Sequence, residues 1–373
     1  MALTLNEEQR YLKDTAKEFF NDNAPISALR LLRDSPSERG YDVSLWNTMV
    51  ELGWSAVTFK EDVGGLDFGF MGLGAIFEES GRTLTASPLF ASVVLAGSAI
   101  EIIGNESQKQ QWLPQIMAGT ITFALALEEK SFHAPENIAL LAVKNDSGYL
   151  LNGEKTFVID GAGADQLLVV AKVEQGLSVF IVDANAEGVK RMQTNLIDSR
   201  NAANITFDNV QVEECNLLGE LGKAQPLLDQ VLDRGRLCLA AEMLGGIQEI
   251  FERTIEYLKE RKQFGAVIGT FQALQHRASQ MFVEIELAKS TVISGLSAID
   301  EGSKKLPLLA SLAKKRVNDV YQLVSNEAIQ LHGGIGVTDE LDLGLFLKRA
   351  RVCLQLLGCS NFHKQRYATY CGY

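Results

Sequence analysis

The chain has 373 residues, 46% hydrophobic and 22% charged, which is enough to bury a large core and suggests two or three subdomains. Its 47 acidic and 35 basic residues give a net charge of −12, which disfavours a general nucleic-acid binder, because such proteins need basic surface. Five scattered cysteines without a CxxC pair argue against a zinc site or a disulfide framework and favour a reducing compartment. Since the sequence shows neither a signal-peptide pattern nor an apolar run of membrane-spanning length, we expect a cytoplasmic protein without membrane or nucleic-acid partners.

The first third of the sequence carries helical patterns. Thr4 and Glu7 form a capping-box pattern ahead of a stretch whose apolar residues recur at helical spacing. Further helical patterns cover residues 44–52, 70–81, 88–103 and 107–119. Residues 1–120 therefore predict an N-terminal helical domain.

The apolar period changes at about residue 121. A strand-like run covers 121–127, and Asn152-Gly153 is a typical signal for a tight hairpin turn, because such turns need positive φ angles. Short apolar or alternating runs follow at 167–173, 177–182 and 204–212. Residues 121–220 predict a middle antiparallel β domain.

The helical period returns over residues 221–373. Four long patterns cover 227–258, 271–300, 307–331 and 342–370, and their short connections predict antiparallel neighbours in a C-terminal helical bundle. The expected fold class is thus α+β, in the order helical domain, β domain, helical bundle. Basic clusters at 314–316 and 348–351 could face a phosphate-bearing ligand or form solvated helix faces.

Two short motifs interrupt the C-terminal helices. RKQFG at 261–265 follows a long helix, where Arg261 can present a planar fork to a pyrophosphate. QLHGGIG at 330–336 is a glycine-rich break whose backbone N–H groups can approach a phosphate closely. Taken singly, each motif is better explained as an ordinary helix end or interhelical loop.

In this order and at this separation, with Phe271-Gln272 behind the first, the two motifs resemble the flavin-binding signatures of acyl-CoA dehydrogenases. The resemblance covers nearly the whole chain. It includes ALALE at 124–128, NGEK at 152–155, and the pair Asp233 and Arg236 just inside a long helix. It implies the family fold, FAD as cofactor and an acyl-CoA thioester as substrate.

The resemblance also implies roles for particular residues. Leu127 would end the strand beside the flavin, Phe157 would pack its ring on the flavin, and Asp233 and Arg236 would bind acyl-CoA. In the family one FAD site draws on two subunits, so a homodimer or homotetramer is implied, with an electron-transfer flavoprotein as acceptor. The residues implied to bind the rest of FAD are Arg261, Phe264, Gln272, Gln330, Gly333 and Gly334.

The catalytic base is missing from both positions at which the family carries it. The reaction needs a carboxylate within hydrogen-bond reach of the substrate α-carbon. Most members place a glutamate directly before Gly-Thr, where this chain has Leu357 before Gly358-Cys359. Other members place it just before the substrate-binding arginine, where this chain has Gly235. The catalytic residue is therefore unassigned, and metal ligands are not expected.

Two nearby carboxylates are candidates to replace the missing base. Glu242 lies seven residues beyond Gly235, on the same helical face but about 10 Å further along, and Asp233 lies on a different face. We expect instead that Glu242 makes a buried hydrogen bond and that Asp233 binds substrate or caps. The loop 128–133 and Ile159 also depart from the family pattern near the flavin ring.

These departures resemble a bacterial subset of the family that works as paired, non-identical subunits, commonly on steroid side-chain acyl-CoAs. One hypothesis is α,β-dehydrogenation of an acyl-CoA, by this chain alone or in an α2β2 assembly with a homologous subunit. The alternative is a non-catalytic subunit that completes a partner's FAD site. A third option, a flavin oxidase or monooxygenase on the same fold, would consume oxygen without an external acceptor.

Overall fold

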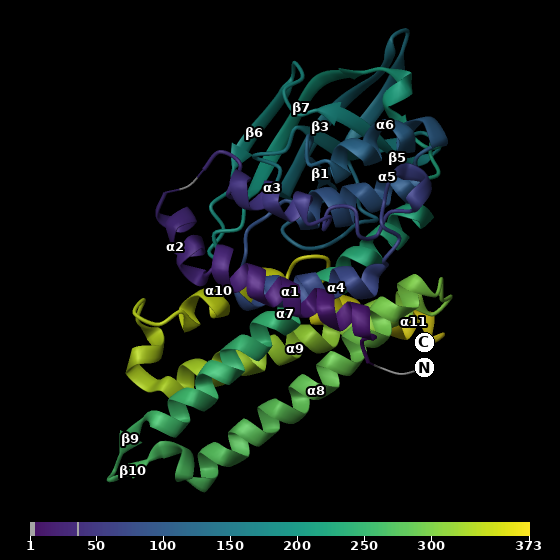
Figure 1. The fold of residues 1–373 in the computed structure, drawn as a ribbon. Helices are drawn as coiled ribbons and strands as arrows, with labels where there is room; N and C mark the ends of the chain where they lie inside the picture. Colours follow the sequence, from purple (N-terminus) through teal and green to yellow (C-terminus); the bar gives the residue numbers. More distant parts are fainter. Residues whose placement is uncertain (1–3, 36) are drawn as a thin grey trace. The chain divides into compact units, whose positions relative to one another are not determined.

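A computed structural model describes residues 4–35 and 37–373, and its elements follow the predicted order of helices, then strands, then helices (Figure 1). The chain folds as two compact units. Unit 1 contains the described part of Met1–Leu29 together with Phe70–Thr85 and Arg236–Tyr373, and unit 2 contains the described parts of Arg30–Gly69 and Ala86–Gly235. The helical, β, helical fold class is confirmed, whereas the domain boundaries at residues 120 and 220 stay a prediction.

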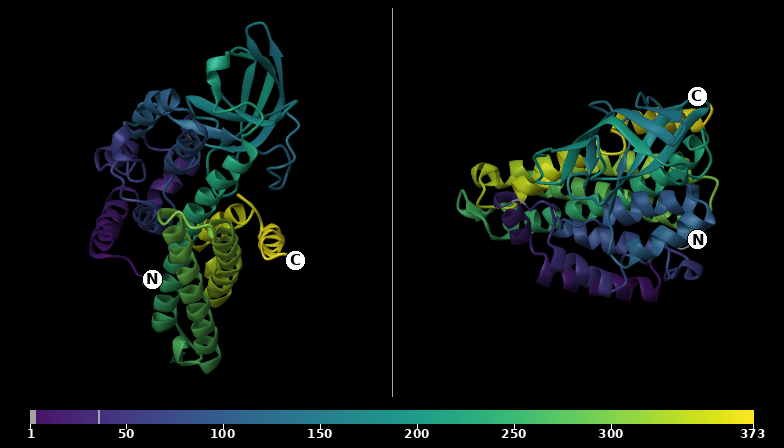
Figure 2. Two further views of the ribbon diagram at one scale, coloured as in Figure 1. Left: turned by 90° about the vertical axis from the view of Figure 1, so that its right-hand side faces the viewer. Right: turned by 90° about the horizontal axis from the view of Figure 1, so that it is seen from above.

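Unit 1 is helical. Its α8 and α9 pack along each other, α9 also contacts α10 and α11, and α1 packs on α4. Figure 2 shows the long helices from two further sides. Its elements are α1 (Glu7–Asn23), α4 (Phe70–Arg82), most of α7 (Gln225–Glu260), the hairpin β9 (Lys262–Gln263) and β10 (Ala266–Val267), η4 (Ile268–Thr270), α8 (Gln272–Asp300), α9 (Leu306–His332), η5 (Gly333–Val337), α10 (Leu343–Cys353) and α11 (Ser360–Tyr370).

Two helix starts in unit 1 have side-chain caps. The capping box of α1 is formed by Asn6 and Gln9, not by Thr4 and Glu7 as the sequence pattern suggested. Asparagine is among the residues preferred at N-caps, and Asn6 lies directly before the first helical residue. At the start of α4, Asp300 accepts hydrogen bonds from the backbone N–H groups of Phe70 and Met71 at 2.6 and 3.0 Å, which ties α4 to the end of α8.

Helices α4 and α7 pack closely against each other at two glycines, Gly81 and Gly245. A Cβ atom at Gly81 would overlap the carbonyl oxygen of Glu242, and one at Gly245 would overlap the carbonyl oxygen of Glu78. The two backbones are therefore in direct contact at these points, a separation that only glycine permits.

The prediction of a single helix over 342–370 is wrong. The structure has two helices there, since α10 ends at Cys353 and α11 begins at Ser360. Leu357 has φ +55° and Gly358 has φ +112°, and neither angle fits a right-handed helix. Gly358 supplied the available sequence signal for this break. We call residues 354–359 the C-terminal turn.

Unit 2 combines helices with the sheet. None of the helices in the described ranges is long and apolar enough to cross a membrane, and a cytoplasmic location stays a prediction. Its helices are α3 (Val43–Glu51), η1 (Glu61–Val63), the π-helix η2 (Leu89–Gly97), α5 (Ser98–Ile103), α6 (Glu106–Met117) and η3 (Glu214–Asn216), while α2 (Ile26–Asp34) runs across the division between the units. Its strands are β1 (Phe123–Ala126), β2 (Leu141–Asn145), β3 (Gly148–Ile159), β4 (Gln166–Val173), β5 (Gly176–Asp183), β6 (Val189–Gln193), β7 (Ala202–Val212) and β8 (Leu217–Leu218).

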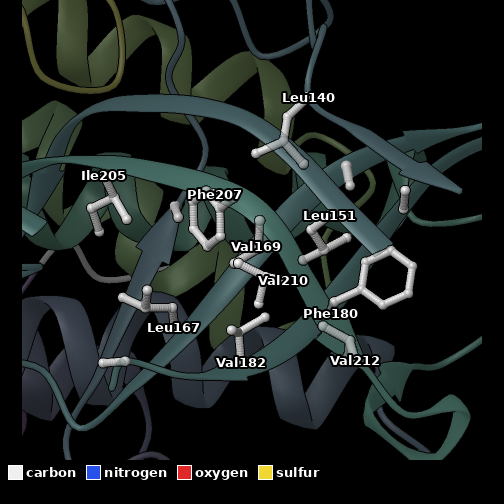
Figure 3. Close-up of a cluster of buried hydrophobic side chains, with 14 of the residues drawn as sticks. Leu140, Leu151, Leu167, Val169, Phe180, Val182, Ile205, Phe207, Val210 and Val212 are labelled. Carbon is white, nitrogen blue, oxygen red and sulfur yellow. The ribbon is translucent and has the colours of Figure 1, made fainter. Parts of the chain in front are cut away.

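The sheet has the strand order β6-β7-β3-β2-β4-β5-β8, with β1 paired to β4. The pairing is antiparallel, as predicted, except that β1 and β2 each run parallel to β4. Apolar side chains of β3, β4, β5 and β7 meet in one core (Figure 3). Its fully buried members include Leu151, Leu167, Val169, Phe180 and Val210.

The hairpin turn predicted at Asn152-Gly153 is wrong. The β2–β3 register pairs Asn145 with Gly148, so the turn consists of Asp146 and Ser147. Gly153 instead lies within β3, where the pairing with β7 shifts register, and its φ is +147°. The positive φ expected of this glycine therefore serves a β-bulge rather than a turn.

Candidate active site

The two motifs that suggested a flavin site are held together by one aromatic contact. The ring of Tyr257, near the end of α7, stacks on the imidazole of His332 with centroids 4.1 Å apart and an interplanar angle of 27°. The Tyr257 hydroxyl also donates to the His332 carbonyl oxygen at 3.2 Å. Arg261 follows α7, and Gly333 follows His332. This contact therefore joins the arginine hairpin (residues 261–267) to the glycine-rich turn (residues 333–337).

His332 is fixed by its own helix as well. Its Nδ1 donates to the carbonyl oxygen of Ala328 at 2.8 Å, and burial lowers the pKa of the imidazole. Burial therefore favours the neutral form of the ring, which serves as a stacking surface for Tyr257.

The predicted FAD residues of unit 1 lie at its surface. Phe264, at the tip of the β9–β10 hairpin, is 93% exposed, and Arg261, Gln272 and Gln330 are exposed too. Nothing lies within 4 Å of the place a Cβ atom would take at Gly333 or Gly334. The open backbone at these glycines fits the diphosphate portion of FAD, because glycine lets N–H groups approach a phosphate.

Unit 2 carries the residues predicted to lie beside the flavin ring. Leu127 directly follows β1 and is 3% exposed, so its side chain belongs to the core. Phe157 is 39% exposed with φ +50°, and its N–H donates to Asn204 Oδ1 at 3.1 Å. It lies in β3 where the register with β7 shifts a second time, and such a bulge can re-aim a side chain out of the sheet.

The loop after Leu127 is held by two pairs that sequence reasoning missed. His133 Nδ1 and a carboxylate oxygen of Glu128 form one short contact. Lys155, fully buried, donates to Glu129 at 2.7 Å and to the Leu127 carbonyl oxygen at 3.1 Å. Burial lowers the pKa of Lys155 to about 8, and Glu129 opposes that shift. No local sequence pattern indicates that this lysine is buried, because its partners lie in another segment of the chain.

The two predicted substrate residues are both on α7. Asp233 and Arg236 are each 1% exposed. Arg236 Nε donates to the Leu357 carbonyl oxygen at 3.3 Å, and its guanidinium lies 5.6 Å from the ring centroid of Phe362. His363 Nε2 donates to the same Leu357 oxygen at 3.1 Å. The structure thus brings Arg236 to the backbone of Leu357, the position at which the sequence resemblance predicts the base.

Glu242, a candidate substitute for the missing base, is ion-paired with Arg349. Arg349 donates to it at 2.9 Å, and both side chains are less than one-tenth exposed. The expected buried hydrogen bond is therefore confirmed. The prediction that residues 348–351 face a ligand or solvent is wrong for Arg349, because this arginine is buried against Glu242.

The basic cluster at 314–316 is likewise divided. Lys315 and Arg316 are partly exposed and ion-paired to Asp319 and Glu284, whereas Lys314 is fully buried. A cavity of about 560 Å³ also opens in unit 1 among α1, α4, α7 and α8, but none of the predicted site residues lines it.

Three family models match the chain in sequence order. The N-terminal domain of acyl-CoA dehydrogenase matches residues 6–120, the middle domain 123–210 and the C-terminal domain 226–369. Among curated relatives, a probable short/branched chain specific acyl-CoA dehydrogenase of Dictyostelium discoideum is 28% identical and covers 98% of this chain and 90% of its own length. The short-chain specific acyl-CoA dehydrogenase of Megasphaera elsdenii is 30% identical, with 84% of this chain and 85% of the relative covered.

Solved structures agree with these matches. Butyryl-CoA dehydrogenase from Megasphaera elsdenii superposes with a TM-score of 0.91 at 26% identity over the full length of both chains. A variant of the Tcur3481–Tcur3483 steroid acyl-CoA dehydrogenase gives a TM-score of 0.89 at 31% identity, with 99% of each chain covered. On these matches and on the fold, the chain belongs to the acyl-CoA dehydrogenase family of FAD-dependent enzymes.

Proposed function

We propose that this chain is one of two different subunits of an enzyme that dehydrogenates an acyl-CoA thioester between Cα and Cβ. The partner, a homologue, supplies the carboxylate base. FAD, when bound, accepts the hydride from the β-carbon. The observation that carries the proposal is at position 357: Arg236 and His363 both bind its carbonyl oxygen, but the side chain is leucine.

On this proposal the chain retains a half-site for FAD. Arg261 and Gln272 bind the pyrophosphate and adenylate, and Gln330 with the exposed backbone of Gly333 and Gly334 receives the adenosine-diphosphate portion. Their exposure supports a site that is shared with another subunit, because a surface arginine and an open glycine backbone leave the ligand's outer side for the neighbour to cover. Phe157, half-exposed on its bulge, would pack on the flavin ring, and Leu127 would support this part of the site from the core.

Asp233 and Arg236 orient the acyl-CoA in this proposal. Arg236 is buried and planar, and it is held between the Leu357 carbonyl oxygen and the Phe362 ring, so its direction is fixed before any ligand binds. Such a fixed cation orients an anionic or carbonyl group without a further loss of side-chain entropy. No proton can be taken up by Leu357 or Gly235, so the base must come from outside these two positions.

Two relatives support the assembly and the electron acceptor. The Tcur3481–Tcur3483 steroid enzyme, which carries two subunit names, supports pairing with a second polypeptide and a steroid-type acyl group. The caffeyl-CoA reductase–Etf complex subunit CarC of Acetobacterium woodii, 29% identical over 93% of both chains, supports an electron-transfer flavoprotein as acceptor.

The test is anaerobic reduction of bound flavin by a panel of acyl-CoAs that includes a steroid side-chain thioester. It is run on the chain alone and on the complex obtained by tagging the chain in its native cells. We expect slow or no bleaching by the chain alone, and rapid bleaching by a complex that contains a homologous subunit with a glutamate before Gly-Thr.

Three other results would contradict the proposal in different ways. Rapid bleaching by the isolated chain would show a base within this chain. Flavin that no thioester bleaches, even in the complex, would favour the alternative, a non-catalytic subunit. Oxygen consumption without an added acceptor would favour an oxidase.

A further inference from the structure

Lys314 is a buried cation whose hydrogen bonds all go to neutral oxygens. Its Nζ donates to Asn318 Oδ1 at 2.6 Å, to the Cys353 carbonyl oxygen at 2.9 Å and to the Gly358 carbonyl oxygen at 3.4 Å. Within residues 4–35 and 37–373, no carboxylate forms an ion pair with it. A protonated lysine has three N–H donors, so these three acceptors use its full capacity.

The bonds of Lys314 reach both ends of the C-terminal turn. The Cys353 carbonyl lies where α10 ends, and the Gly358 carbonyl lies just before α11. Asn318 Nδ2 also donates to the Gly358 oxygen, at 3.3 Å. Between these two anchor points, the Leu357 carbonyl oxygen accepts from Arg236. Lys314 therefore holds the two ends of the turn whose middle contacts Arg236.

Burying a lysine among neutral acceptors lowers the stability of the folded chain, because the charge loses its hydration. Replacing a buried charge by an apolar side chain of similar volume is often neutral or stabilising. Stability alone therefore does not account for a cation here, whereas fixed backbone geometry does, because charge-assisted hydrogen bonds are the stronger ones.

We propose that Lys314 is a positioning residue of the acyl-CoA site: its three hydrogen bonds fix the C-terminal turn and thereby set the position of Arg236 toward the substrate. This inference rests on the proposed function for the role of Arg236. All three donors of Lys314 are used by these bonds, so Lys314 acts on the substrate only through the turn.

Protonation of Lys314 should affect this geometry. Burial lowers its pKa to about 7; the nearby Arg236 lowers it further, while Cys353 and Cys359 oppose the shift. His363 also faces the turn, through its bond to Leu357. A neutral amine has only two N–H donors for three acceptors, so deprotonation removes one hydrogen bond from the turn.

The experiment compares Lys314→Met with a matched control, Lys315→Met. Methionine keeps the unbranched apolar stem of lysine, is one atom shorter and has no hydrogen-bond donor. The control makes the same change one residue further along α9, on a side chain that is 29% exposed and ion-paired to Asp319. Both variants are made in the FAD-loaded complex.

Two measurements distinguish an effect on the C-terminal turn from an effect on substrate binding. The first is the labelling rate of the Cys353 thiol, which is buried at the turn, against that of Cys238, which is buried within α7. The second is the affinity for desulfo-coenzyme A, which carries the part shared by all acyl-CoAs and lacks a competing thiol. The affinity is also followed from about pH 6 to about pH 9, across the range in which Lys314 loses its proton.

We expect Lys314→Met to speed labelling of Cys353 roughly ten- to hundredfold, with Cys238 unchanged. This is the fold-change that corresponds to the net contribution of one hydrogen bond to a charged group. We also expect Lys314→Met to bind desulfo-coenzyme A more weakly. Its affinity should lack the pH dependence that Lys314 causes in the wild type. The wild type and Lys315→Met should both lose affinity as pH rises through about 7.

Faster labelling of Cys353 with unchanged affinity would overturn the positioning role and leave a purely structural lysine. Unchanged labelling would overturn the three-bond anchor itself. If the wild-type complex bound no desulfo-coenzyme A while Cys353 labelling still rose in Lys314→Met, the proposed acyl-CoA function would fail and the positioning role with it, although the anchored turn would stand.

Discussion

The ring of Tyr257 lies against the imidazole of His332, and its hydroxyl binds the His332 backbone. This contact joins two segments of unit 1 that sequence resemblance had linked only by function. The arginine hairpin and the glycine-rich turn are therefore expected to respond together to a ligand or to a mutation.

Tyr257→Ala should weaken FAD binding without removing any proposed FAD contact. A stacked aromatic pair contributes about 0.5–1.5 kcal/mol, so the dissociation constant of FAD should rise roughly three- to tenfold. Fluorescence titration of the apoprotein with FAD measures this change. Tyr257→Phe, which keeps the ring and loses only the hydroxyl, is the control and should lie close to the wild type. Equal affinities for all three proteins would show that the stack does not order the site.

Leu357→Glu should install a base in this chain. Leu357 already has φ +55°, so the new side chain starts from an existing backbone geometry. General-base catalysis typically contributes roughly 10²–10⁴-fold, and the rate of flavin bleaching by a suitable acyl-CoA should rise within that range. Leu356→Glu, the same change one residue earlier, should leave the rate unchanged. If both variants behaved alike, position 357 would not face the substrate.

Glu242→Gln should reduce stability rather than proton transfer. The substitution leaves Arg349 buried beside a neutral amide, and breaking a buried pair costs about 3–5 kcal/mol. Glu249→Gln on the same helix, where the pairs with Arg82 and Arg253 are more exposed, should cost about 1 kcal/mol or less. Urea unfolding measures both values. A Glu242→Gln protein of normal stability but lower turnover would instead identify Glu242 as the base.

Stability should rise with pH in a way that depends on Lys314. Its pKa is about 7 in the folded chain and 10.5 as the ordinary lysine value, so between these limits the unfolded chain binds more protons. The free energy of unfolding then increases with pH, by roughly 1.4 kcal/mol per pH unit for one such group. Below about pH 7 both states are protonated, and the cost of burying the charge is fully present.

The Lys314→Met protein isolates this contribution. Lys155, whose pKa is lowered to about 8, acts in the same direction in both proteins and cancels in the comparison. Denaturant unfolding of the two proteins from about pH 7.5 to about pH 9.5 should show a steeper rise for the wild type. Parallel curves would mean that Lys314 keeps an ordinary pKa.

The sequence patterns identified long elements better than their interruptions. Helical periodicity located α7, α8 and α9 because each buries a continuous apolar face. It ran through the C-terminal turn, where left-handed Leu357 has no residue-type signal and only Gly358 marks the break. The Asn-Gly pair in β3 predicts a turn although it forms a bulge, because both features use a glycine with positive φ.

The polar interior was less accessible to sequence reasoning. Lys314 bonds to carbonyl groups 39 and 44 residues away, and Lys155 bonds to residues 26 and 28 positions before it. Neither spacing has a local pattern, so both lysines looked like ordinary surface charges. Glu242 was better anticipated, since a carboxylate on the inner face of a core helix needs a partner.

The backbone contact between α4 and α7 at Gly81 and Gly245 will influence how a mutational survey of this protein is interpreted. Any side chain at either position would have to displace a carbonyl oxygen of the facing helix. A screen scored by growth or activity would therefore rank both glycines among the least tolerant positions, beside residues assigned to the chemistry. Measuring protein abundance in the same screen would tell the two groups apart, because changes at these glycines should lower the amount of folded chain.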